Sequence, residues 1–419
     1  MIQVFSASWA LFLGMFMLMI GNGLQGTLLG LRGESEGFST TELSVVMSGY
    51  FMGFLFASKM VPGMIRRVGH IRVFAALGST ISAVLILYPA LVEPWAWTIG
   101  RIIIGFCFCG VYVTAESWLN DASTNETRGQ ALSVYMIVQM AGIVVAQWIV
   151  TQADISGFIL FIIPSVLVSL AFAPILLSVK PTPAFDQTKP MTIRQLIATS
   201  PLACVGMFLL GGVFSAQFGM SAVYGARAGF SVGQISLFVS SIYVAALVAQ
   251  YPIGWISDRM DRRVLILWIA FIGGLGCLLG AFLSNSYLIA LVAGAAIGGT
   301  SNPLYALLIA YANDYLARED MAAASGGLLF INGVGAIAGP LIVGAMMDRL
   351  GPTGYWVFLT TLMFSVTLYG IYRSFRRARP SEDYEPVSYA PIAVNTTSIV
   401  AEMAQEAYIE AESEDVPRE

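Results

Sequence analysis

Twelve long apolar stretches joined by short polar connections determine what this chain can fold into. A helix needs about 20 residues to cross a hydrocarbon layer of roughly 30 Å. Hydrophobic residues make up 57% of the 419 residues and charged residues only 11%, which excludes an ordinary soluble domain. The sequence therefore predicts an all-α, polytopic membrane protein with twelve transmembrane helices. The predicted spans are residues 8–29, 43–61, 73–92, 95–119, 131–151, 155–179, 202–224, 235–256, 264–283, 287–311, 324–346 and 355–372.

Lysine and arginine are distributed unequally between the connections. Of the 21 such residues, only Arg32, Arg227 and Arg349 lie in odd-numbered connections, and Arg101 lies inside the fourth span. The others lie in the even-numbered connections, at their borders or after the last span. Because positive residues accumulate on the cytoplasmic side, both termini are predicted to be cytoplasmic, in the inner membrane of a bacterium. The first 30 residues lack a basic start and a cleavage site, so they predict a first span rather than a signal peptide.

The two halves of the chain repeat each other at an offset of 193 residues. The repeat pairs Gly105 with Gly298, Tyr112 with Tyr305, Asn120 with Asn313, Asp121 with Asp314 and Gly142 with Gly335. Since the offset covers six spans, both copies have the same orientation, an arrangement typical of transporters with a solute site between the halves. The predicted parts are a six-helix bundle (1–179), a cytoplasmic linker (180–200), a second six-helix bundle (201–377) and an acidic, mostly disordered cytoplasmic tail (378–419).

Three short motifs resemble those of the major facilitator superfamily (MFS). Residues 254–263, GWISDRMDRR, are similar to its signature between spans eight and nine, with Asp261 where a glycine is usual. Residues 101–105, RIIIG, resemble its fourth-span Arg-x-x-x-Gly element. Residues 335–340, GAIAGP, resemble its Gly-x-x-x-Gly-Pro element, here in the eleventh span instead of the fifth. AESWLN at 115–120 is similar to the YcaD-like branch. The resemblance implies two pseudo-symmetric six-helix bundles, transport by alternating access, and a role for Arg101 in proton coupling.

Polar side chains inside the spans are the candidates for a solute pathway. Burying them in hydrocarbon is costly, so they face a neighbouring helix or a water-filled cavity. Spans three, six, nine and twelve contain no Asn, Gln or charged residue, which predicts that these helices face lipid. Five candidates lie about 6–10 Å to the outer side of their span midpoints: Asn22, Gln25, Arg101, Gln147 and Gln217. Five lie nearer the midplane: Gln139, Tyr243, Asn302, Tyr305 and Asn332. The alternative for each amide is an interhelical hydrogen bond, worth about 0.6 kcal/mol.

Arg101 is the one permanent charge deep inside a span. Its guanidinium cannot be neutralised by deprotonation, so it needs an acceptor, an anionic ligand or water. Two hypotheses follow. Either backbone carbonyls and the amides of Gln25 and Gln147 satisfy it, or it takes part in solute binding or proton coupling.

Charged residues at the cytoplasmic helix ends are predicted to form ion pairs that close the inner face. The expected partners of Glu116 are Arg66, Arg67 and Arg128, while Asp258 with Arg259 and Asp314 with Arg318 serve the second half. Arg262 belongs to the same basic turn. Breaking such pairs would favour the opposite access state.

These features predict a monomeric secondary transporter whose partners are a small organic solute and the lipid bilayer, with protons as a candidate coupling ion. No cofactor or nucleic acid is expected, and no Gly-x4-Gly-Lys-Ser/Thr nucleotide cradle occurs. Asn22 stands where an acidic residue would favour proton coupling, which leaves facilitated diffusion open. A sensor that signals through the acidic tail is the alternative function. An intramembrane enzyme is disfavoured because the single histidine, His70, falls in a connection, and Cys107 and Cys109 point in different directions along one helix.

The predicted topology can be tested by cysteine labelling with a membrane-impermeant reagent applied from outside. Sites beside Arg32 and Asp154 should react in intact cells, whereas sites beside Lys189 and Arg262 should react only after permeabilisation, because the charge asymmetry places them inside. Reaction beside Arg262 in intact cells would refute the topology.

Overall fold

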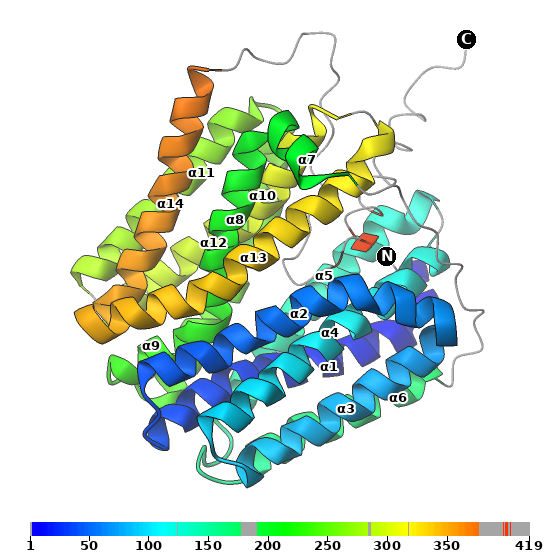
Figure 1. The fold of residues 1–419 in the computed structure, drawn as a ribbon, viewed down its shortest axis with the longest axis vertical. Helices are drawn as coiled ribbons and strands as arrows, with labels where there is room; N and C mark the ends of the chain where they lie inside the picture. Colours follow the sequence, from blue (N-terminus) through cyan, green and yellow to red (C-terminus); the bar gives the residue numbers. More distant parts are fainter. Residues whose placement is uncertain are drawn as a thin grey trace.

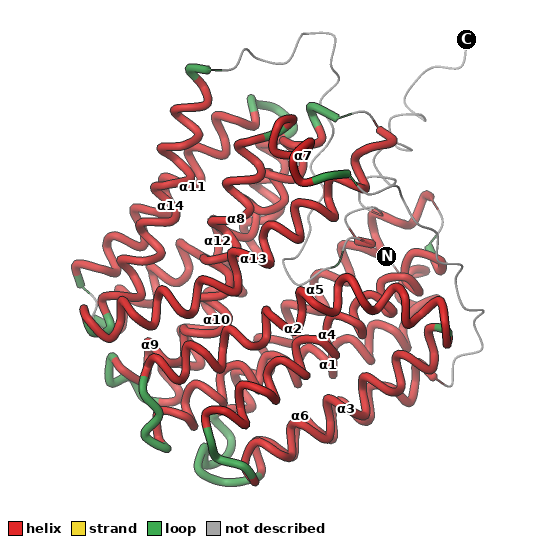
Figure 2. The backbone as a smooth tube through the Cα atoms, in the orientation of Figure 1, coloured by secondary structure: helices red, strands yellow, loops and turns green. Residues whose placement is uncertain are grey.

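The computed structural model describes residues 2–123, 125–176, 191–283, 286–316 and 318–376, together with residues 397, 399, 400 and 403. Over these residues the chain consists of helices and short connections, without a strand (Figure 2). Residues 180–190 of the predicted linker and nearly all of the predicted tail lie outside the described residues. At its end the predicted linker contains a short helix, α7 (Ile193–Thr199), which begins with a capping box between Thr192 and Gln195.

Two groups of helices form the body of the molecule (Figure 1). The first consists of α1 (Ile2–Ser35), α2 (Thr40–Val68), α3 (His70–Ala90), α4 (Pro94–Ala122), α5 (Asn125–Val150) and α6 (Ile159–Leu176). The second begins with α8 (Pro201–Ser215), a π-helical turn η1 (Ala216–Met220) and α9 (Ser221–Arg227), which together make one span. It continues with α10 (Val232–Ser257), α11 (Arg262–Phe282), α12 (Tyr287–Asn313), α13 (Arg318–Leu350) and α14 (Thr353–Ser374). Among the described residues, eleven spans are long and apolar enough to cross a membrane. The remaining one, α6, corresponds to the sixth predicted span and has 18 residues.

The turn before the second membrane-spanning helix has the same structure in both halves. Gly37 and Gly229 both have a positive φ, of 82° and 78°, which a glycine adopts without steric cost. Two residues later, Ser39 and Ser231 each begin a helix with a capping box, to Glu42 and Gln234 respectively. The shared pattern Gly-Phe-Ser-x-x-Glu/Gln extends the internal repeat to a turn that the sequence analysis did not recognise.

Repeat-related glycines let paired helices cross in backbone contact. A Cβ added to Gly105 of α4 would lie 1.9 Å from the carbonyl oxygen of Tyr50 in α2. A Cβ added to Gly298 of α12 would lie 2.1 Å from the carbonyl oxygen of Ile242 in α10. Small residues at such crossings permit the close packing that holds membrane helices together. Both halves are therefore built on the same glycine-dependent crossing.

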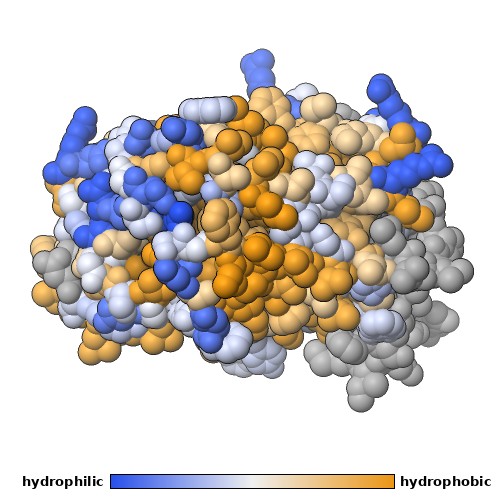
Figure 3. Space-filling model, turned by 90° about the horizontal axis from the view of Figure 1, so that it is seen from below, coloured by the Kyte–Doolittle hydropathy of each residue, from blue (hydrophilic) through white to orange (hydrophobic). Residues whose placement is uncertain are grey.

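The helices predicted to face lipid lie on the outside of the molecule. α3 and α6 pack together along one side, and α11 and α14 pack together along the other (Figure 1). They expose large apolar side chains such as Leu87, Leu170, Trp268 and Leu368. Apolar residues form a broad belt across the middle of the face shown in Figure 3, as a protein embedded in hydrocarbon requires.

The two ends of the bundle are named here from the predicted topology. The outer end contains the connections 36–39, 151–158, 228–231 and 351–352, and the inner end contains α7 and the connection 258–261.

Replacing either crossing glycine with alanine should destabilise the protein by about 1–3 kcal/mol, because the added methyl overlaps a backbone carbonyl. We expect Gly105→Ala and Gly298→Ala to lower the melting temperature of the detergent-solubilised protein. Gly63→Ala is the matched control, since a Cβ there meets no atom within 4 Å. An unchanged melting temperature for both crossing variants would contradict this packing.

Candidate functional site

A cavity of about 590 Å³ lies between the two halves, near the middle of the predicted membrane. Its walls come from α2, α4 and α5 of the first half and from α8, η1, α10, α12 and α13 of the second. It extends to the inner end, where residues of α7 and the start of α13 border it. Aromatic side chains dominate the central walls: Tyr50, Phe51, Phe54, Phe214, Phe218, Tyr243 and Phe330. All but Tyr243 were missed as candidates because an aromatic residue in an apolar span carries no sign of which way it faces.

Four of the predicted site residues reach this cavity, all from the second half: Gln217, Tyr243, Asn302 and Asn332. The Gln217 amide nitrogen donates to the Ser301 hydroxyl at 3.1 Å. The Asn332 amide nitrogen donates to the Met207 carbonyl oxygen at 2.9 Å. Gln217 lies on the π-helical turn, a local distortion often found at functional sites. The cavity thus offers carboxamides held by neighbouring helices.

Lys59 of α2 brings a positive charge to the cavity wall. Its Nζ lies 4.2 Å from the ring centroid of Phe330 on α13, so the ammonium also contacts the opposite half. Among the described residues that line the cavity, none is a carboxylate. The described part of the wall is therefore neutral to positive.

Arg101 lies behind the aromatic wall and does not line the cavity. Its guanidinium carbon is 4.9 Å from the Tyr50 ring centroid and 5.9 Å from that of Phe218. Nη2 contacts the sulfur of Met47 at 3.5 Å. In the part of the chain that the structure describes, Nε and Nη1 have no hydrogen-bond partner, although the residue is fully buried. Only two rings separate this charge from the cavity.

The amides expected to satisfy Arg101 bind elsewhere. Gln25 donates to Asn22, whose own amide nitrogen donates to the hydroxyls of Tyr50 at 3.2 Å and Tyr112 at 2.8 Å. This network joins α1, α2 and α4. Gln147 accepts a hydrogen bond from Thr27 at 2.9 Å and so joins α5 to α1. Of the two hypotheses for Arg101, satisfaction by these amides is therefore wrong in this conformation.

Gln139 of α5 and Tyr305 of α12 are fully buried but are not among the described residues that line the cavity. The structure thus brings four of the ten candidates to one surface. The other six are buried away from that surface.

Three polar contacts toward the outer end join the two halves. Arg227 of α9 pairs with Glu34 of α1 at 3.3 Å, and the hydroxyl of Thr41 donates to Asp348 at 2.6 Å. Deeper in, the Ser48 hydroxyl donates to the Ile337 carbonyl oxygen at 2.6 Å. These contacts join α1 and α2 to α9 and α13, so the outer end is closed in this conformation.

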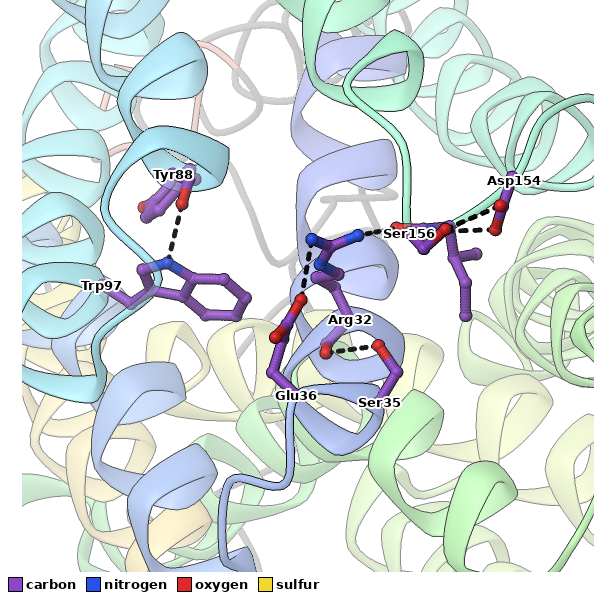
Figure 4. A network of polar contacts seen from close by, with 8 residues as sticks. Arg32, Ser35, Glu36, Tyr88, Trp97, Asp154 and Ser156 are labelled. Carbon is purple, nitrogen blue, oxygen red and sulfur yellow. Dashed lines mark hydrogen bonds and ion pairs between the residues drawn. The ribbon is translucent and has the colours of Figure 1, made fainter.

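A second outer-end network holds the first half together (Figure 4). Arg32 pairs with Glu36 at 2.7 Å and donates to the Ile155 carbonyl oxygen at 3.1 Å. In the same loop, hydrogen bonds from the hydroxyl and N–H of Ser156 hold the pKa of the Asp154 carboxyl below its usual value. Arg32 thereby fixes the α5–α6 connection to the end of α1.

At the inner end, Asp258 lies beside Arg262 and not in an ion pair with Arg259, and the predicted pair of Asp314 with Arg318 falls outside the described residues. Arg262 contacts Asp314 and lies 4.0 Å from Asp258, so one arginine serves both carboxylates. Arg259 instead stacks on Trp255, with its guanidinium carbon 4.1 Å from a ring centroid. These contacts brace the ends of α10, α11 and α12 within the second half and do not join the two halves. The side chain of Arg318 lies outside the described residues.

Glu116 of α4 is also bound differently from the prediction. Its carboxylate accepts hydrogen bonds from Tyr135 of α5 at 3.0 Å, from the Thr397 N–H at 2.9 Å and from the Thr397 hydroxyl. Arg66 and Arg67 are exposed at the end of α2. Sequence spacing could not indicate a partner 281 residues away.

Comparison with known proteins places this geometry in a family. The sequence matches the profile of the Major Facilitator Superfamily over residues 11–233 and 202–401. It is 24% identical to an uncharacterized MFS-type transporter of Enterobacter sp. (strain 638), over 90% of this chain and 97% of that protein. It is 25% identical to the uncharacterized MFS-type transporter YfkF of Bacillus subtilis (strain 168), over 85% of this chain and 92% of that protein.

Solved structures show the same fold. The nucleoside transporter NupG superposes with a TM-score of 0.73 at 13% identity, covering 90% of this chain and all of that chain. A bacterial homolog of the human lysosomal transporter Spinster superposes with a TM-score of 0.67 at 13% identity, covering 97% and 98%. The chain therefore belongs to the major facilitator superfamily, a family of membrane transporters.

Proposed function

We propose that this protein is a secondary transporter that binds a small organic solute in the central cavity and moves it by alternating access between the two halves. The observation that carries the proposal is the cavity itself. It lies between the halves, closes at the outer end and extends to the inner end. Its volume of about 590 Å³ falls within the range of small-molecule sites.

The chemistry of the walls defines the class of solute. Rings such as Phe54 and Phe218 favour a flat or apolar body, and the carboxamides of Gln217 and Asn332 can hydrogen-bond to its polar edge. Lys59 at the wall and Arg101 behind it favour a neutral or anionic group. We therefore propose a neutral or anionic solute with an aromatic or similarly flat ring.

The environment of Arg101 depends on how the two halves are arranged around the cavity. Tyr50 and Phe218, which cover the guanidinium, come from different halves of the molecule. Relative movement of the halves would separate these rings and let a solute group or water reach the unpartnered Nε and Nη1 atoms. In this proposal Arg101 binds the solute during transport and is screened from it in the present state.

The solute can be identified by a thermal-shift screen of the purified protein against nucleosides, aromatic carboxylates and antibiotics. A compound that raises the melting temperature then serves as the probe in equilibrium binding and in liposome counterflow. Counterflow with and without a pH gradient separates proton coupling from facilitated diffusion.

Phe54→Ala should weaken binding of that probe by about tenfold, because it removes one aromatic wall of the cavity. Phe56→Ala is the matched control, two residues along the same helix, with a side chain 60% exposed on the outside. The measurement is the dissociation constant in detergent. Equal affinities of the two variants would refute the cavity as the binding site.

Arg101→Gln should keep or raise the melting temperature, because it removes a buried charge that has incomplete compensation. The same variant should lose at least tenfold in counterflow, and Arg101→Lys should recover only part of it, since an ammonium lacks the planar fork of the guanidinium. Arg376→Gln, at an exposed arginine stacked on Tyr372, is the control. Normal counterflow in folded Arg101→Gln would remove Arg101 from the mechanism.

A further inference from the structure

A short segment near the C-terminus lies at the inner mouth of the cavity. Thr397 and Ile399 both line the cavity. Val400 and Met403 have exposed fractions of 2% and 0%. These four residues, called here the docked segment, come after α14, which ends at Ser374. Such burial of apolar side chains indicates that the segment packs against the helices, because a solvated tail would leave them exposed.

Glu116 anchors the docked segment. Its carboxylate is completely buried, and it accepts hydrogen bonds from the Thr397 N–H and hydroxyl as well as from Tyr135. Removing a carboxylate from water costs several kcal/mol unless hydrogen bonds compensate. Glu116 therefore depends on the docked segment for its stabilisation, and the segment depends on Glu116 for its position.

The docked segment lies against both halves of the molecule. It bonds to Glu116 of α4 in the first half, and it lines the same cavity as Gly326 and Phe330 of α13 in the second half. It occupies space between the inner ends of the two halves, beside Thr192 and Ile193 at the start of α7, which also border the cavity. Closure of the inner end, which alternating access requires, would need this space to be emptied.

We infer that the docked segment is an autoinhibitory wedge. While Thr397 is bound to Glu116, the inner end stays open and the transporter does not alternate; release of the segment restores alternation. The effect on transport rests on the proposed function, but docking itself can be measured without any solute.

Hydrogen exchange of the full-length protein in nanodiscs tests the docking. Glu116→Ala should speed amide exchange in the peptide that contains Thr397 by about tenfold or more, because hydrogen bonds to a charged group are lost. Ser117→Ala is the control: it is the next residue on α4, and its hydroxyl bonds to the Val113 carbonyl of its own helix at 2.8 Å. Exchange as slow in Glu116→Ala as in the unaltered protein would overturn the inference.

A second pair of variants keeps Glu116 in place, should its replacement prevent folding. Thr397→Val replaces the hydroxyl with a methyl group of similar size and should speed exchange at Val400 and Met403. Thr367→Val is the control, because Thr367 is equally exposed, at 7%, and bonds within its own helix. Equal exchange in these two variants would also overturn the inference.

The inhibition can be tested by cysteine labelling. The Ser48→Cys variant, in a Cys109→Ser background, is labelled with a membrane-impermeant thiol reagent applied from outside. Ser48 is buried in the closed outer contact, so its labelling reports opening of the outer end. Adding Thr397→Val should raise the labelling rate about tenfold, and adding Thr367→Val should leave it unchanged. An unchanged rate with Thr397→Val would refute the wedge. If docking and labelling behave as expected but no solute binds the cavity, the proposed function fails and the wedge stands.

Discussion

Hydrocarbon offers a polar group no partner, so every polar group in a membrane span must find one inside the protein or face a cavity. The arrangement of this molecule follows from that constraint. Its backbone is satisfied within helices, and spans without amides or charges lie outermost. Polar side chains of the inner helices either bond to each other, as Asn22 does with Tyr112, or reach the central cavity, as Gln217 does. Arg101 is a buried charge whose Nε and Nη1 have no hydrogen-bond partner among the described residues, and for that reason it is central to the proposed mechanism.

The sequence predicted the membrane fold well, because a polar side chain in a long apolar stretch restricts where the helix can lie. It could not distinguish an amide that lines the cavity from an amide that bonds to a neighbouring helix. Asn332 and Gln147 look alike in the sequence, yet one lines the cavity and the other bonds to Thr27 within a half. The difference depends on the rotation of each helix, which apolar neighbours set through packing. The aromatic walls were missed for the same reason.

The sequence also could not predict which residues far apart in the chain would bond to each other. Nearby charges suggested arginine partners for Glu116, but burial removed it from the exposed Arg66 and Arg67 and left it to Thr397. Arg262 was expected in the inner charge cluster and does pair there, with Asp314 of the repeated Asn-Asp motif. Which charged side chains pair depends on their depth in the membrane and on which helix ends lie together in the fold. Spacing along the chain indicates neither.

Movement of the halves between two arrangements is the central claim, and paired distance measurements test it most directly. Spin labels at Ser35 and Arg349 report the outer end, and labels at Arg67 and Asp320 report the inner end; all four side chains are exposed. Double electron–electron resonance of the Thr397→Val protein in nanodiscs, in which the docked segment is expected to be released, should show two populations at each end. Addition of a solute that binds the cavity should shift the outer and inner distances in opposite directions. A single unchanged distance at both ends, or distances that change together, would contradict alternating access in this protein.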